Sequence, residues 1–338
     1  MPDHPKSFQP NVSQSPCGGV IDPIDGRDHD SEPRRDDDVT PRQERVGLLC
    51  AALCALNGAF VPAVAKFTAA HAEPGFVAAV TSLFGGLFAA IVLGLRGDLR
   101  VLARPAMTPR LVALAALGTT APSYLFFLGA SRASAIDAVL CLQCEPAYSL
   151  LLAWLVLGHR PTARRVAAIG VLLAGIGFAV GAHGVSGSTG VWILLATPLC
   201  WQLSHLIVLR RLVGMSPSVL TGARYIHGGI LLTLGWLLSG GLNRLPDATV
   251  FLGQLPWLAL QGMVLSFGGT LLWYGAITRL DLARSTAIVV PSVPLLSLGA
   301  SFAVLGEVPT AQQWIGLLLT GAGVMAFVTA PHATTAPA

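Results

Sequence analysis

From Val46 onward the sequence consists of apolar runs of about twenty residues, separated by short polar breaks. A helix of that length crosses the roughly 30 Å hydrocarbon core of a bilayer. In lipid, every backbone polar group has to be paired within the protein, so such runs fold as helices rather than as open strands or loops. The pattern therefore predicts an all-α transmembrane protein.

We count ten apolar runs and predict a ten-helix bundle. Their approximate bounds are 46–67, 74–95, 111–131, 133–157, 166–182, 191–209, 218–240, 255–278, 282–305 and 312–329. The composition agrees, because 53% of the 338 residues are hydrophobic and only 11% are charged, which is too little polar surface for a water-soluble protein of this length. Residues 1–45 are rich in Pro and charged residues, and we expect them to form a disordered cytosolic tail. Residues 331–338 form a second, short cytosolic tail.

Basic residues are concentrated in alternate loops. They follow the second, fourth and sixth runs and flank the connection from the eighth to the ninth, within residues 96–110, 160–165, 210–211 and 279–284. Lys and Arg in short loops are retained on the cytoplasmic side of the membrane. We therefore expect a multi-pass protein of the cytoplasmic (inner) membrane with both termini in the cytoplasm.

Two stretches resemble each other at a spacing of about 148 residues. Residues 133–162 and 281–310 each carry a central Pro and end in Leu-Gly-x-x-Pro-Thr, and the Gly-rich residues 169–177 match residues 315–323. Each half then has five helices, an odd number, so the second half enters the membrane inverted. The sequence predicts two inverted five-helix repeats, residues 46–182 and 188–330, an arrangement that secondary transporters use to open a central site to either side.

These residues resemble the EamA-type members of the drug/metabolite transporter superfamily. The resemblance is carried by Glu145-Pro146 with Leu157-Gly158-His159-Arg160, by Pro294 with Leu305-Gly306-Glu307, and by the first run from Leu56 to Lys66. The sequence departs from the family at His159, where Glu is frequent, and at Thr81 and Ser82, where Arg is frequent. The resemblance implies two EamA-like repeats and transport of amino acids, other metabolites or drugs.

Glu145 is the first candidate for the transport site. A charged side chain near the centre of a membrane helix costs about 2.5–3.5 kcal/mol on insertion scales, so it faces a cavity or a partner rather than lipid. Tyr148 lies on the same helical face, and Gln143 is close by in the sequence. Substrate contact or proton coupling is one reading of Glu145; a structural hydrogen bond at the Pro146 kink is the other.

Arg224 and His227, in the seventh run, are the second pair of candidates. The planar fork of Arg suits a carboxylate on a substrate, whereas pairing with Glu145 or extension to the membrane surface are structural alternatives. His205, Trp201, Trp273 and Tyr274 complete the predicted substrate-binding residues, with ordinary core packing as the alternative for each.

No sequence feature indicates an enzyme, a cofactor or a metal site. The Gly-rich stretches lack the phosphate-binding pattern GxxxxGK[ST], and Cys141 and Cys144 lie inside an apolar run. The Arg clusters form no continuous basic face, so nucleic acid is not an expected partner. The expected partners are a small-molecule substrate and the lipid bilayer, and homodimer formation is left open.

The sequence therefore favours a secondary transporter that moves a small metabolite or drug-like solute across the cytoplasmic membrane by alternating access. One candidate class of solute is amino-acid-like. Coupling to protons is a hypothesis that rests on Glu145 and the buried His residues. The alternative is a membrane sensor or partner-binding scaffold on a transporter-like fold, with the acidic tail engaging the partner.

Overall fold

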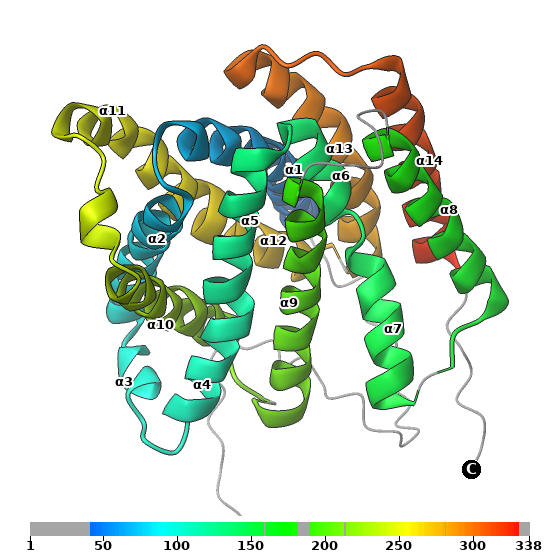
Figure 1. Ribbon diagram of the computed structural model, residues 1–338. Coiled ribbons are helices and arrows are strands. Elements are labelled where there is room, and N and C mark those ends of the chain that lie inside the picture. The colour runs from blue at the N-terminus through cyan, green and yellow to red at the C-terminus, as the bar shows by residue number, and fades with distance from the viewer. Residues whose placement is uncertain (1–40, 159, 182–188, 213, 281, 331–338) are drawn as a thin grey trace, which may run out of the picture.

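The computed structural model describes residues 41–158, 160–181, 189–212, 214–280 and 282–330, and within them every regular element is a helix (Figure 1). His159 and both predicted tails lie outside the described residues, except for residues 41–45 of the first tail. The first half contains α1 (Pro41–His71), α2 (Pro74–Arg96), α3 (Leu99–Leu102), α4 (Thr108–Ala115), η2 (Ala116–Thr120), α5 (Ala121–Arg132), α6 (Ala135–Leu142), α7 (Glu145–Leu157) and α8 (Ala163–Val180). The second half contains α9 (Thr189–Arg211), α10 (Pro217–Leu238), η4 (Gly241–Arg244), α11 (Ala248–Ala259), η5 (Leu260–Gly268), α12 (Gly269–Ile277), α13 (Leu282–Leu305) and α14 (Ala311–Thr329).

The described residues confirm an all-α membrane fold and include nine helical segments that are long and apolar enough to cross a bilayer. They coincide with nine of the ten predicted runs. The remaining run is α10, which has 22 residues but carries Arg224 and His227 in its length, and these polar residues lower its hydropathy. The count of ten crossings thus stays a prediction that depends on α10.

Several predicted single helices differ in detail from the structure. Helix α1 begins at Pro41, so its first turn includes residues that the sequence assigns to the tail. The fourth run is divided between α6 and α7, with the break at Gln143 and Cys144 immediately before the Glu145-Pro146 pair. Proline has no backbone N–H and is tolerated in the first turn of a helix, which explains why α7 begins there.

The repeated Leu-Gly-x-x-Pro-Thr motif forms the same turn in both halves. Gly158 and Gly306 have φ of 74° and 68°, a left-handed conformation that ends a helix and that glycine adopts without strain. Thr162 and Thr310 then cap α8 and α14, because each hydroxyl accepts a hydrogen bond from the backbone N–H three residues later. The repeat in the sequence is thus a repeated stop and start signal.

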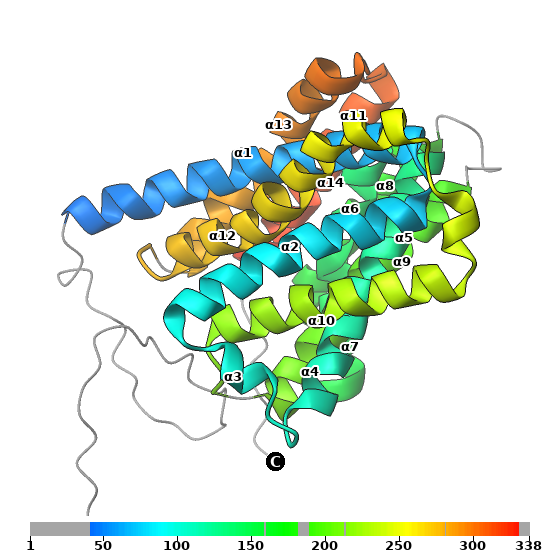
Figure 2. The same ribbon diagram turned by 90° about the vertical axis from the view of Figure 1, so that its left-hand side faces the viewer.

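Corresponding helices of the two halves pack against each other in opposite directions, as an inverted repeat requires. Glu73 at the start of α2 contacts Trp236 at the end of α10, whereas Gly222 near the start of α10 lies against Leu93 near the end of α2. Figure 2 shows α2 and α10 side by side, and Figure 1 shows α8 beside α14. Small residues permit the close approach, since a Cβ at Gly316 would lie 2.3 Å from that of Ala179.

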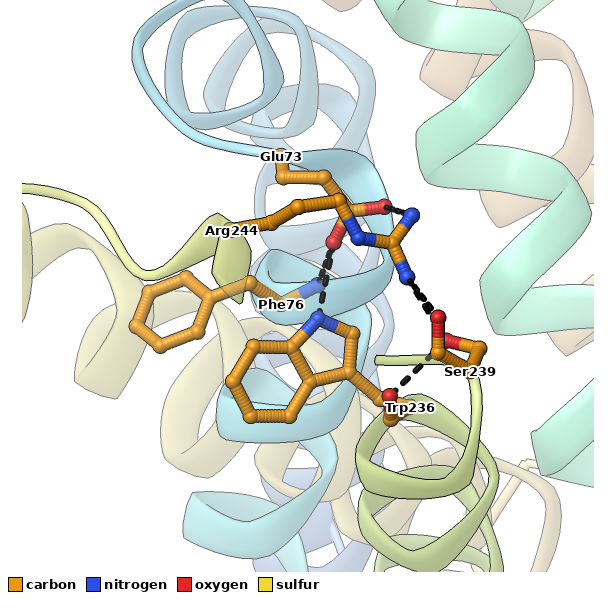
Figure 3. A network of polar contacts seen from close by, with 5 residues as sticks. All are labelled: Glu73, Phe76, Trp236, Ser239 and Arg244. Atoms are coloured by element: carbon orange, nitrogen blue, oxygen red, sulfur yellow. Dashed lines mark hydrogen bonds and ion pairs between the residues drawn. The ribbon is translucent and has the colours of Figure 1, made fainter. Parts of the chain in front are cut away.

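Glu73 organises the end of the bundle at which α2 begins and α10 ends (Figure 3). Its Oε2 accepts hydrogen bonds from the Phe76 N–H at 2.8 Å and from the Trp236 indole N–H at 2.9 Å, and Oε1 lies 3.7 Å from Arg244 Nη1. Arg244 also donates to the backbone carbonyl and the hydroxyl of Ser239. The carboxylate thereby joins the two halves; we call this side of the molecule the Glu73 end.

We predict that Trp236→Phe lowers the free energy of unfolding by about 1 kcal/mol, because it removes one hydrogen bond to a carboxylate that keeps its other partners. The apparent melting temperature of the purified protein in detergent measures the effect. Trp192→Phe is the matched control, because Trp192 is 69% exposed. An equal change in both variants would contradict a specific role for the indole N–H.

Glu307 makes a second connection at the Glu73 end, outside the spanning helices. Its carboxylate accepts a hydrogen bond from the Ala135 N–H at 3.0 Å, which ties the turn after α13 to the start of α6. Burial raises the pKa of Glu307, although hydrogen bonds from the Ala135 and Ile136 backbone and the charge of Lys66 act against this. Asp137 nearby raises the pKa further.

This raised pKa predicts a pH dependence of stability. The folded protein binds a proton on Glu307 more tightly than the unfolded chain does, so the resulting stabilisation is present below the ordinary Glu pKa and is lost as pH rises through the raised value. The stability of the wild type relative to Glu307→Gln should therefore fall with rising pH across this window. Melting temperatures of both proteins at a series of pH values test this, and parallel curves would contradict it.

Candidate functional site

A cavity of about 250 Å³ lies between the two halves. Helices α1, α2, α5 and the segment η2 contribute from the first half, and α9, α10, η5 and α12 contribute from the second. Its apolar wall consists of Val61, Pro122, Phe126, Phe127 and Trp201. The cavity is therefore shared between the repeats, where a transporter with two inverted halves has its site.

The rest of the lining is polar. Hydroxyl groups come from Thr81, Ser82, Thr119, Ser123, Ser266 and Thr270, and Arg224, Tyr225 and Gln261 complete the polar side. Membrane helices expose few such groups to lipid, since an unsatisfied polar group in hydrocarbon costs several kcal/mol. Their concentration in one place indicates a binding site for a solute with polar and apolar parts.

Two π-helical segments border this cavity, and they occupy corresponding places in the two halves. η2 interrupts the helix formed by α4 and α5, and η5 interrupts the one formed by α11 and α12. Each segment holds a side chain from the other half through a backbone carbonyl: Gly118 accepts from Arg224, and Leu265 accepts from Asn57 at 2.8 Å. π-Helical turns inside α-helices are frequent at functional sites, and these two shape the cavity wall.

Arg224 is the charged residue of the cavity. Its Nη2 donates to the Gly118 carbonyl, and its Nε is buried without a hydrogen-bond partner. Across the part of the chain that the structure describes, no carboxylate oxygen lies within 4.0 Å of its guanidinium nitrogens. Gly118 is required for this placement, because a Cβ there would lie 2.7 Å from Arg224 Nε. Arg224 is half-buried and its Nε is fully enclosed, so an unbonded Nε–H is costly there, and an anionic ligand in direct contact would relieve that cost.

Glu145 lies next to the cavity rather than in its lining. Its Oε1 accepts a hydrogen bond of 2.7 Å from Gln202 Nε2, and Gln202 follows the cavity residue Trp201 on α9. Arg224 is close enough to act electrostatically on both Glu145 and His205. Glu145 is the first residue of α7, where the helix dipole also favours a negative charge. Glu145 is thus close to Arg224 at the edge of the cavity, whereas His205 is an exposed residue of α9.

Both halves of the chain match the same protein family. Residues 45–181 and residues 188–329 each match the EamA-like transporter family. The chain belongs to the EamA-like transporter family. This confirms the predicted resemblance and the repeated helical units, and it makes the protein a multi-pass membrane transporter of small solutes and not an enzyme.

The chain is also similar to a curated protein and to a solved structure. A protein of Streptantibioticus cattleyicolor described as a probable terminal-alkyne amino-acid exporter is 32% identical over 225 residues, which cover 64% of this chain and 72% of that protein. A solved crystal structure of another protein is 20% identical and has a TM-score of 0.56, covering 84% of this chain and 96% of that one. At that identity, the crystal structure shows a shared fold alone.

The EamA-like fold separates the residues that the sequence nominated. Arg224 and Trp201 line the cavity, and Glu145 and His205 lie near Arg224. The other five belong to neither group. Tyr148 packs against a cluster between α8 and α14, and Trp273 packs against a cluster between α1 and α13.

The remaining three predicted residues contact only neighbouring parts of their own helices in the interactions described. Nδ1 of His227 lies 3.1 Å from the Ala223 carbonyl of its own helix. Gln143 forms the break between α6 and α7, and Tyr274 lies on α12 beside Trp273. No hydrogen bond in the described structure joins these three side chains to Arg224 or Glu145.

Sequence reasoning missed the neutral polar residues of the cavity, namely Thr81, Thr119 and Gln261. All three are at most 3% exposed. A usable signal was present, because Gln261 is an amide inside an apolar run and Thr119 belongs to a Gly-Thr-Thr sequence inside another. Thr residues in membrane helices usually bond their own backbone, as Thr233 does here, so the signal is weak without the fold.

Proposed function

We propose that the protein is a secondary transporter that exports a small amino acid with an apolar side chain across the cytoplasmic membrane by alternating access. The observation that carries this proposal is Arg224, a half-buried cation whose Nε is enclosed and without a hydrogen-bond partner, in a cavity shared by both halves. A substrate carboxylate would supply the missing anion in the bidentate geometry that a guanidinium favours.

The apolar wall of the cavity supports the second part of the substrate assignment. Phe126, Phe127 and Trp201 offer a surface for an aliphatic or unsaturated side chain, and the volume of about 250 Å³ admits a small solute only. The relative from Streptantibioticus cattleyicolor is described as a probable exporter of a terminal-alkyne amino acid. This description favours export and an amino acid with a short side chain for the present protein.

The inverted arrangement of the halves supports alternating access around the cavity. The basic loops gather at the end opposite Glu73, where Arg110, Arg210 and Arg211 lie. Retention of such loops in the cytoplasm would place both termini in the cytoplasm and the helices in the inner membrane. We also propose that transport is coupled to protons. The proximity of two titratable residues, Glu145 and His205, to Arg224 supports this part of the proposal.

Counterflow into liposomes tests the proposal. Purified protein is reconstituted into liposomes loaded with unlabelled propargylglycine, and the entry of labelled propargylglycine is followed. We expect protein-dependent accumulation that norvaline inhibits and that the corresponding amine without a carboxylate does not inhibit. Absence of accumulation, or equal inhibition by the amine, would overturn the carboxylate assignment. If an imposed pH gradient leaves the rate of propargylglycine entry unchanged, proton coupling is rejected, whereas the carboxylate assignment stands.

A further inference from the structure

Four lining residues of the cavity each have a buried polar atom without a hydrogen-bond partner. These atoms are Thr81 Oγ1, Thr119 Oγ1, Arg224 Nε and Gln261 Oε1. Buried polar atoms in native proteins are generally paired, and an unpaired one costs about 1–3 kcal/mol. Four in one cavity indicate that its occupant supplies more than one kind of hydrogen-bonding group.

The four atoms fall into two groups. Thr119 and Arg224 belong together, because a Cβ at Gly228 of α10 would lie 2.8 Å from the Thr119 side chain and Gly118 contacts Arg224. Thr81 and Gln261 form the second group. Gly262, adjacent to Gln261, packs so closely on α2 that a Cβ there would lie 2.2 Å from the Thr81 carbonyl oxygen.

Both groups are held in one place by the packing of α2 on α10. A Cβ at Gly86 of α2 would lie 2.8 Å from the Tyr225 carbonyl oxygen, and one at Gly229 of α10 would lie 2.9 Å from the Ser82 carbonyl oxygen. The backbones on either side of the cavity are thus in contact, and neither group can move away from the other without separating these helices. A single small ligand can therefore reach both groups.

The chemistry of the two groups differs. Arg224 is a cation that only donates hydrogen bonds, so its group binds an anion. The free atom of Gln261 is an amide oxygen, which only accepts, and the Thr81 hydroxyl beside it can accept as well. The second group is therefore suited to a hydrogen-bond donor on the ligand, and the amino group of an amino acid is such a donor.

We propose that Gln261 is a specificity-determining residue, which selects substrates with a hydrogen-bond donor beside the carboxylate held by Arg224. This inference rests on the proposed function, because it assigns one part of the same site. A site built to bond a polar group rejects the analogue that lacks it, since its own buried atoms are then left unpaired. The protein should thus discriminate strongly against simple carboxylic acids of the same length.

Binding of two matched probes to the purified protein tests this role. The probes are propargylglycine and its desamino analogue pentynoate, whose dissociation constants are measured by calorimetry in detergent. We expect Gln261→Leu to weaken binding of propargylglycine about 10- to 100-fold and to leave pentynoate binding unchanged or stronger, because the variant has no amide oxygen to leave unpaired. Thr81→Val should produce a smaller change in the same direction.

Gln254→Leu is the matched control. Gln254 is also a buried glutamine, 6% exposed, with an unpaired Oε1, but it lies on α11 and does not line the cavity. It should retain the wild-type preference. If Gln261→Leu weakens binding of both probes equally, or keeps the wild-type preference for propargylglycine over pentynoate, Gln261 does not determine specificity. If the wild type binds neither probe, the proposed function fails instead. Gln261→Met makes the same test should the Leu variant not be recovered as a monodisperse protein.

Discussion

Replacing Arg224 with glutamine is expected to reduce counterflow of propargylglycine about 100-fold or more, which corresponds to about 3 kcal/mol of lost substrate binding. Glutamine keeps hydrogen-bonding capacity but has no charge to offer a carboxylate. Arg224→Lys should retain an intermediate rate, because an ammonium group supplies the charge without the planar pair of donors. Counterflow rates that decrease in the order Arg, Lys, Gln at position 224 indicate carboxylate recognition.

Arg100→Gln provides the control for a general effect of removing a positive charge. Arg100 is exposed on the short helix α3, away from the cavity, and its loss should leave counterflow at the wild-type rate. Equal activity of Arg224→Gln and Arg100→Gln would show that Arg224 is not a substrate ligand. Size-exclusion profiles of all variants establish that the compared proteins are folded.

Gly262→Ala, next to the cavity residue Gln261, is expected to lower the free energy of unfolding. The new Cβ would lie 2.2 Å from the Thr81 carbonyl oxygen, 2.8 Å from the Phe84 Cβ and 3.0 Å from the Gly85 nitrogen. Two of these atoms are backbone and cannot rotate away, so α2 and η5 have to separate. Overpacking of this kind costs about 1–3 kcal/mol and should lower the apparent melting temperature by about 2–8 °C.

Gly253→Ala separates this clash from the general effect of replacing a helical glycine. Nothing lies within 4 Å of a Cβ at Gly253 on the adjoining helix α11, and alanine favours a helix by about 0.5–1 kcal/mol over glycine. The control should therefore melt at the wild-type temperature or slightly above it. A Gly262→Ala protein that melts with the control would contradict the close contact between α2 and η5.

The helices were predictable because their signals are local. Apolar length marks the crossings, and the repeated Leu-Gly-x-x-Pro-Thr supplies a left-handed glycine and a Thr cap within six residues. The breaks inside the crossings were not predictable in the same way. η2 and η5 accept hydrogen bonds from Arg224 and Asn57, which are distant from them in the sequence.

The candidate site was predictable only in part. Arg224, which lines the cavity, and Glu145, which lies beside it, were chosen as candidates because an ionisable side chain inside an apolar run is conspicuous. The direction in which a helix turns its polar residue depends on its neighbours, and this is why Tyr148 and Trp273 were nominated although they pack in clusters outside the cavity. Gln261 and Thr81 carry no charge and were passed over.

The sequence by itself thus determined that the chain lies in a membrane and that its two halves are related, and it predicted that the halves are inverted and that Glu145 and Arg224 need a polar environment. These conclusions depend on hydropathy, on a repeat and on the cost of burying charge, which are properties of single segments. The tertiary structure alone decided which polar atoms share the cavity and which of them lack partners. Whether a buried group is satisfied depends on atoms from helices far apart in the chain, and only the packed bundle brings those atoms together.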